Sequence, residues 1–291
     1  MDEQSSIDAY LAAFRGYQEV LDDYEDPAFQ KQLRAQGAVL EVCFQRLLQA
    51  AESQQPAVWH AIGTAYNTGR GTKHDRTEAI CWFRRAAEAG FAPAMLNLGL
   101  CLHLPAPAVN QAEAIHWFRK AAERGYAGGM VWLGFAYREG SGVPCDYNEA
   151  VQWFIKAVEA GDSHSMIHVG RMYAHYLSSP VQAVPWFLRA AQAVQAESFL
   201  ELARLYENRQ LEVYNPAEAH KWFRVAAEYS EGRSTSALFA LARQHLDGLG
   251  APCDVEAARF WLRRVLLVVP EKSSSRREAT KMLKNLEGQL L

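Results

Sequence analysis

The sequence lacks a long apolar run, an export signal and an excess of basic residues. No stretch approaches the roughly 18 consecutive apolar residues of a membrane-spanning helix. The first ten residues, MDEQSSIDAY, carry acids and no base, and they include no apolar segment typical of a signal peptide. The net charge is −3, which argues against a basic surface for nucleic acid. These absences predict a cytoplasmic protein that neither inserts into a membrane nor binds nucleic acid.

The sequence is also poor in patterns that carry chemistry. Its five cysteines are irregularly spaced, which fits neither a disulfide framework nor a paired-cysteine zinc site. We expect them to be small buried side chains in a reducing compartment. There is no G-x-S-x-G, no phosphate-binding loop and no dinucleotide fingerprint. The sequence therefore predicts a protein that is not an enzyme and that carries no cofactor or metal.

What the sequence does contain is a short string that returns six times. Clear copies are AICWFRRAAEAG from residue 79, AIHWFRKAAERG from 114 and AVQWFIKAVEAG from 150. The tryptophans of the six copies are Trp82, Trp117, Trp153, Trp186, Trp222 and Trp261, in steps of 33 to 39 residues. A period of this length is typical of a helical repeat array. The in-phase recurrence predicts that each Trp and the apolar ring or Leu after it lie in the core.

Each copy carries its own signal for the start of a helix. The residue seven positions before each Trp can cap a helix through a short side-chain oxygen: Asp75, Asn110, Asp146, Ser179, Asn215 and Asp254. Glu or Gln follows three residues later in five of the six copies, as in a capping box. Pro180 and Pro216 stand at the first helical position, where a missing N–H costs little.

A second helical pattern precedes each copy, with a small residue at its centre, as in Leu98-Gly99 and Leu133-Gly134. Glycine in a helix costs about 1 kcal/mol relative to alanine, so it indicates a close approach of another helix. Each unit therefore reads as helix, turn, helix. Because one such pair cannot bury its own apolar face, neighbouring pairs must stack to form the core.

These features resemble the Sel1-like repeat family, a relative of the tetratricopeptide repeat. The segment MVWLGFAYREGSGVPCDYNEAVQWFIKAVEAG, residues 130–161, follows the family pattern nearly throughout. The resemblance implies an all-α fold, a right-handed α-solenoid of about six repeats over residues 53–269. It also implies an adaptor or scaffold, of a kind that in bacteria is often tied to secretion systems or to contact with other cells. Repeat four departs most, since it is shortened and carries Pro185 inside its second helix, where a kink is expected.

The flanks lack the repeat. Residues 1–52 are predicted to form two helices, the first with an apolar stripe of Ile7, Leu11, Phe14, Tyr17 and Leu21. Residues 270–291 are predicted to form one amphipathic helix. Solenoids need polar-faced end caps, so both flanks read as caps, with a docking arm as the alternative for the N-terminal one.

The concave groove is the expected binding site, because the first helices of stacked pairs usually line the inner face. Helical spacing places a mixture of rings, Arg, His and polar groups there, typical of an interface centre. The predicted groove residues are His60, Asn97, Leu100, Trp132, Phe135, Arg138, His164, His168, Arg171, His175, Glu201, Arg204, Asn208 and Arg243, with Thr64 and His103 beside them.

The segment HSMIHVGRMYAH, residues 164–175, is the most distinctive part of this set. His164, His168, Arg171 and His175 form one helical stripe. Two His at i and i+4 can share a zinc ion, although no other ligand stands at a suitable spacing. The stripe can instead be a cationic surface that strengthens below about pH 6.5, or simply a wet polar face. Cys81 with His116, and Cys101 with His103, are candidate thiol–His pairs, with chance proximity as the alternative.

The function predicted from these residues is a scaffold that binds a protein or peptide partner in its groove. A narrower hypothesis is a bacterial immunity or chaperone-like protein whose partner is a secreted effector or toxin with an acidic face. The alternatives are a purely structural spacer and an enzyme like the β-lactam-hydrolysing relatives of this family. Those relatives carry a regular cysteine pair in each repeat, which this chain does not have.

Overall fold

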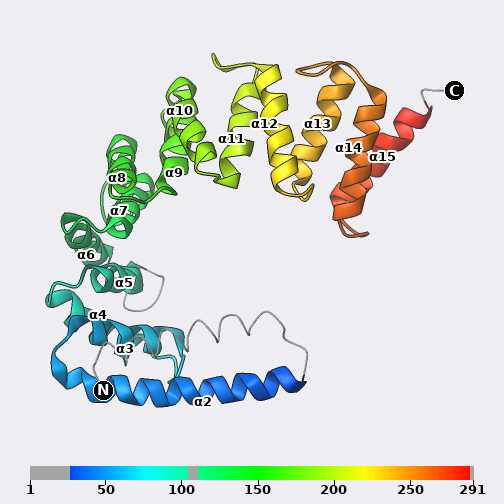
Figure 1. The fold of residues 1–291 in the computed structure, drawn as a ribbon. Helices are drawn as coiled ribbons and strands as arrows, with labels where there is room; N and C mark the ends of the chain where they lie inside the picture. Colours follow the sequence, from blue (N-terminus) through cyan, green and yellow to red (C-terminus); the bar gives the residue numbers. More distant parts are fainter. Residues whose placement is uncertain (1–26, 104–110, 289–291) are drawn as a thin grey trace. The chain divides into compact units, whose positions relative to one another are not determined.

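The fold is all-helical in the computed structural model, which describes residues 27–103 and 111–288 (Figure 1). No strand occurs in these two ranges. Contacts divide the chain into two compact units, residues 1–146 and 147–291. No helix of the described ranges is long and apolar enough to cross a membrane. The predicted all-α solenoid of helix pairs is confirmed, and each unit is described by itself below.

The first unit contains one long helix, two complete helix pairs and the first helix of a third pair. The elements are α2 (Pro27–Ala50), η1 (Ala51–Ser53), α3 (Pro56–Thr68), α4 (Arg76–Glu88), α5 (Ala92–His103), α6 (Gln111–Glu123) and α7 (Ala127–Glu139). Successive helices pack on one another from α2 to α7. The chain thus stacks repeat on repeat, as the periodic sequence predicts.

The second unit continues the same pattern and ends in a single helix. Its elements are α8 (Tyr147–Glu159), α9 (Ser165–Arg171), η2 (Met172–Tyr176), α10 (Pro180–Gln192), α11 (Ala196–Glu207), α12 (Pro216–Tyr229), α13 (Thr235–Asp247), α14 (Val255–Val268) and α15 (Ser274–Gly288). Each helix again packs on its sequence neighbours. Helix α15 packs on α14 inside the segment predicted to be the C-terminal cap.

The predicted helix starts are largely confirmed. Asp75, Asn215 and Asp254 each cap a helix, since a side-chain oxygen accepts from backbone N–H groups of the first turn. Helix α8 begins directly after Asp146. Ser179 occupies the cap position of α10 without capping it, because its hydroxyl donates to the carbonyl of Leu177. Asn110 lies outside the described residues.

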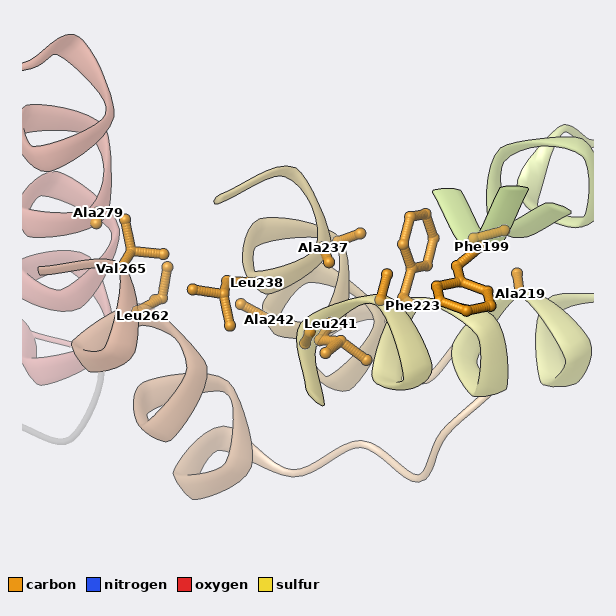
Figure 2. Packing of buried hydrophobic residues seen from close by; sticks show 14 of the residues in the cluster. Phe199, Ala219, Phe223, Ala237, Leu238, Leu241, Ala242, Leu262, Val265 and Ala279 are labelled. Atoms are coloured by element: carbon orange, nitrogen blue, oxygen red, sulfur yellow. The ribbon is translucent and has the colours of Figure 1, made fainter. Parts of the chain in front are cut away.

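In the first five repeats the core contains a buried Phe from the second helix, and Leu262 takes this place in the sixth. Phe83, Phe118, Phe154 and Phe187 are almost fully buried. A Cβ on Gly63 would lie 2.7 Å from the ring of Phe83, and one on Gly170 2.6 Å from that of Phe187. These distances are too short for any side chain, so glycine sets the helix spacing there. Figure 2 shows the buried cluster of the last repeats, in which Phe199, Phe223, Leu241 and Leu262 lie among small residues such as Ala219 and Ala242.

The tryptophans differ from the prediction that they are core residues. Of the six tryptophans that recur with the repeat, only Trp117 is buried, while the other five are half-buried. The Trp stands one residue before the buried Phe, which turns it about 100° around the helix to the edge of the packed face. A cation from the next turn covers its ring in several repeats, with Lys156 4.1 Å from the Trp153 centroid and Arg189 4.7 Å from that of Trp186.

Repeat four is irregular, but not where Pro185 predicts. Helix α10 continues through Pro185 from Pro180 to Gln192, and a single missing N–H removes only one of its backbone bonds. The irregular element is the first helix, whose end, η2, is a π-helix. This wider turn accompanies the shortened loop before α10, and π-helical turns are frequent at functional sites.

The N-terminal flank contains a feature that the sequence reading missed. The second half of α2 repeats the pattern of a second helix: RLLQAAE, residues 46–52, corresponds to WFRKAAE, residues 117–123. Leu47 is fully buried, like Phe118. A Cβ on Gly71 would lie 2.5 Å from the carbonyl oxygen of Leu40, as one on Gly142 would lie 2.8 Å from that of Gln111. Helix α2 therefore packs as the second helix of a preceding repeat-like unit. The predicted helix before it lies outside the described residues.

Candidate interaction faces

The first-helix face of the first unit is held together by neutral contacts. Asn97 on α5 donates from Nδ2 to Nε2 of His60 on α3, over 2.9 Å. The His60 ring also packs against Phe83 and Phe91. Burial lowers the pKa of His60 to about 4, so the ring is neutral at physiological pH. His60 and Asn97 therefore tie two repeats together, while Leu100 lies half-buried on α5.

An aromatic cluster on α7 is the main feature of this face. Trp132 stacks on Phe118 at 5.8 Å, and it meets the rings of His103 and Phe135 edge-on, each at 5.6 Å. The guanidinium of Arg138 lies 4.8 Å from the Phe135 centroid. Trp132, Phe135 and Arg138 are all half-buried, so each keeps an accessible part. We call these three residues the α7 cluster.

The first-helix face of the second unit is held by charges instead. Arg171 donates from Nε to Glu201 and from Nη2 to Glu197, both over 2.8 Å, and these pairs link α9 to α11. Burial lowers the pKa of Arg171, but the bonds and attraction to Glu201 and Glu197 outweigh it and raise the pKa overall. Nε2 of His175 lies 3.6 Å from Glu201. Glu201 is nearly buried, so the network compensates a carboxylate held away from water.

The predicted His/Arg stripe is therefore divided among different environments. His164 is exposed and precedes α9, His168 packs on Phe154, and His175 lies in the π-helix η2. Arg171 forms ion pairs with Glu197 and Glu201, so its charge is compensated within the structure. No group of three or more potential metal ligands occurs among the described residues.

The remaining predicted residues lie further along the second unit. Arg204 and Asn208 are exposed on and just after α11. Arg243 on α13 is exposed and lines a small cavity of about 100 Å³ together with Glu207, Arg209 and Asp247. A cavity of this size is well below the volume of a typical cofactor site.

Three of the five cysteines differ from the expectation that all are buried. Cys43 and Cys101 are buried as predicted, but Cys81, Cys145 and Cys253 are exposed, and all five are free. Cys101 contacts Asn67 at 3.6 Å, and burial raises the pKa of its thiol, which makes it a poor nucleophile. The turn cysteines donate to first-helix carbonyls, Cys145 to Arg138 and Cys253 to Leu246, which explains their exposed positions.

The Sel1 repeat pattern matches residues 60–91, 92–126, 127–162, 200–228 and 235–264. This chain belongs to the Sel1 repeat family. The five matches skip repeat four, the repeat that contains the π-helix and the shortened loop. The comparison with curated proteins gives no match.

Solved structures of Sel1 repeat proteins share the fold. A protective antigen of uropathogenic Escherichia coli with an SLR fold is 31% identical, with a TM-score of 0.65, over 76% of this chain and 48% of that one. This chain thus spans about half the length of that protein. A Sel1 repeat protein from Oxalobacter formigenes is 29% identical, with a TM-score of 0.60, over 80% and 93% of the two chains. An immunity protein from Pseudomonas aeruginosa is 19% identical over 74% and 82%, with a TM-score of only 0.39.

The sequence analysis did not identify two residues that contact the predicted groove residues. Phe118 belongs to a second helix, so helical spacing assigned it to the core, yet its ring also supports Trp132. Glu197 stands one turn before Glu201 on α11, and this i, i+4 pair of acids was the available signal for a bridge to Arg171.

Proposed function

We propose that this Sel1 repeat protein is a non-enzymatic scaffold that binds a protein or peptide partner on the inner faces of its first helices. Sel1 and tetratricopeptide-like repeats are scaffolds typical of protein–protein interaction. The observation that carries the proposal is the α7 cluster. Trp and Arg are the residues most enriched at interface hot spots, and here both are held in fixed positions by neighbouring rings.

Preorganisation is the physical reason to favour this cluster. Trp132 is clamped between Phe118, His103 and Phe135, so little side-chain entropy is lost when a partner covers it. Arg138 also forms an ion pair with Glu139, 2.5 Å away, which fixes its guanidinium over Phe135. An apolar or aromatic anchor of a partner fits beside such a ring, with a polar group meeting Arg138.

The test is affinity capture from native cell extract with tagged wild type and Trp132→Ala, followed by titration of the purified co-eluting protein. Removing the central ring is expected to weaken binding about tenfold or more. Trp261→Ala, which removes a half-buried Trp from a second helix, is the matched control and should bind like wild type. Equal binding by Trp132→Ala, with the fold intact by circular dichroism, would move the site away from α7.

A narrower proposal concerns the partner. In it the chain acts in the bacterial cytoplasm as an immunity or chaperone-like protein for a secreted effector or toxin. The ion pairs of Arg171 give no reason to expect an acidic face on that partner. Co-expression provides the test: the captured protein should be toxic alone and harmless with wild type, and Trp132→Ala should protect less well. A harmless partner would exclude the toxin while leaving the scaffold proposal in place.

A further inference from the structure

Charge is distributed unevenly along the chain. The first 26 residues contain eight acids and one base, Arg15. The other 265 residues contain 25 acids and 29 bases, so they are net positive although the whole chain has a charge of −3. The acids are densest at the end of the segment, where LDDYED, residues 21–26, directly precedes α2.

A basic surface stands at the other end of the chain, on α15. Arg277, Lys281 and Lys284 are exposed and follow one face of the helix, at i, i+4 and i+7. They line a shallow cavity of about 440 Å³ that contains a single acid, Glu271. Within the described ranges no acid pairs with any of these three cations. We call Arg277, Lys281 and Lys284 the C-terminal basic surface.

Two exposed aliphatic residues stand at the end of α14, which Arg276 joins to the start of α15. Arg276 donates from Nη1 to the carbonyls of Leu266 and Val269, which holds the end of α14 against the start of α15. Between those two residues, Leu267 is 83% exposed and Val268 37% exposed. Exposed aliphatic side chains next to unpaired cations form a surface suited to an acidic segment that also has an apolar stripe.

We propose that the C-terminal basic surface binds residues 1–26 of a second copy of this chain. The segment has the matching chemistry, because its predicted apolar stripe of Ile7, Leu11, Phe14, Tyr17 and Leu21 accompanies eight acids. A second copy is the source because its segment can reach α15 whatever the arrangement of the two units within one chain: the segment leads into α2, which packs on α3 in the first unit, whereas α15 packs on α14 in the second. Such head-to-tail contact joins two different surfaces, so copies can add in a row. This self-association goes beyond the proposed partner binding and does not depend on it.

Sedimentation of the full chain over a range of concentrations tests the proposal. Wild type is expected to associate reversibly, and more weakly as salt is raised, because exposed charge pairs are screened. The triple variant R277E/K281E/K284E should associate about tenfold more weakly or worse. The matched control K73E/R119E/R124E makes the same charge change at exposed cations of the first unit and should associate like wild type.

Charge reversal on both sides sharpens the test. D22K/D23K/E25K should also weaken association, and mixing it with R277E/K281E/K284E should restore complexes that neither variant forms alone. Restoration depends on the two surfaces meeting, so it does not follow from a general effect of charge. A monomeric wild type, or weakening by the control equal to that by the α15 variant, would overturn the proposal.

Zero-length cross-linking of mixed unlabelled and ¹⁵N-labelled chains identifies the copy involved. Links from Lys281 or Lys284 to acids within residues 1–26 should join labelled to unlabelled peptides. Links confined to one label would place the segment on its own chain and overturn the second copy as occupant.

Discussion

The first-helix faces of the two units use equivalent positions of the repeat pattern, but different interactions join their neighbouring helices. In the first unit a hydrogen bond from Asn97 to His60 and a ring contact between His103 and Trp132 link neighbouring repeats. In the second unit Arg171 bridges to Glu197 and Glu201. The core beneath both faces is the same, a buried Phe against a glycine, as at Phe83 and Phe187.

The difference teaches which part of a repeat is free to vary. The Gly–Phe contact leaves no room for a side chain, so it constrains the repeat wherever it occurs. The inner face has only to join neighbouring first helices, and either ring contacts or ion pairs can do so. The charged solution coincides with the π-helix η2 in repeat four, the repeat that departs most from the family pattern.

The largest expected difference between the two faces is their response to acid. His60 has a pKa of about 4 in the fold and about 6.5 when unfolded, so acid favours the unfolded state. Its stabilisation is complete above pH 6.5 and is lost as pH falls toward 4, about 2 kcal/mol of it by pH 5. Hydrogen exchange at pH 7.5 and 5 should show this loss in α3 and α5 of the first unit.

His60→Gln should abolish the acid-dependent loss of stability, since the Gln side chain can still accept a hydrogen bond from Asn97 but does not titrate. The matched control is His116→Gln, at an exposed histidine of the same unit, which should keep the wild-type dependence. An unchanged acid response in His60→Gln would mean that other groups cause it.

The second expected effect is confined to the charged face. Arg171→Ala removes the guanidinium that is hydrogen-bonded to the nearly buried Glu201 and leaves His175 at 3.6 Å, so a loss of about 1 to 2 kcal/mol is expected, tempered by the partial exposure of Arg171. Arg204→Ala, at an exposed arginine of α11, should change stability little. Urea unfolding checks both.

The double variant Arg171→Ala/Glu201→Gln isolates the cause. It should recover part of the loss, because no charge then remains in the nearly buried position. If the double variant is no better than Arg171→Ala, lost packing of the long arginine stem explains the effect rather than a stranded carboxylate.

Comparison of the two faces also shows what the sequence can predict. The repeat, the helix starts and the buried Phe were predictable because each recurs in phase, and Asp75, Asn215 and Asp254 cap helices where spacing indicated. Tryptophan was misassigned because recurrence reveals a constant position without revealing how far around the helix it lies. Trp153, for example, is half-buried, and Lys156 covers its ring.

The candidate site was less predictable because its residues do not recur. Helical spacing placed His60 and Arg171 on the inner face, yet their partners come from neighbouring helices 37 and 30 residues away in sequence. Burial between these helices keeps His60 neutral, and the acids of α11 pair with Arg171. Spacing within one helix carries no information about such partners, so the chemistry of the face required the fold.

The smallest expected effect concerns Arg138, on the first-helix face of the first unit. Arg138→Met keeps the apolar stem over Phe135 and removes only the charge, so the cation–ring contact and the half-exposed pair with Glu139 are lost together. Such contacts near the surface contribute about 0.5 to 1 kcal/mol, and less at high salt. Urea unfolding at low and high salt measures this change. A loss of stability well above that range would show that Arg138 holds α7 in place. An Arg138 variant would then alter the helix as well as the surface. The binding role of the α7 cluster would have to be tested through Trp132 alone.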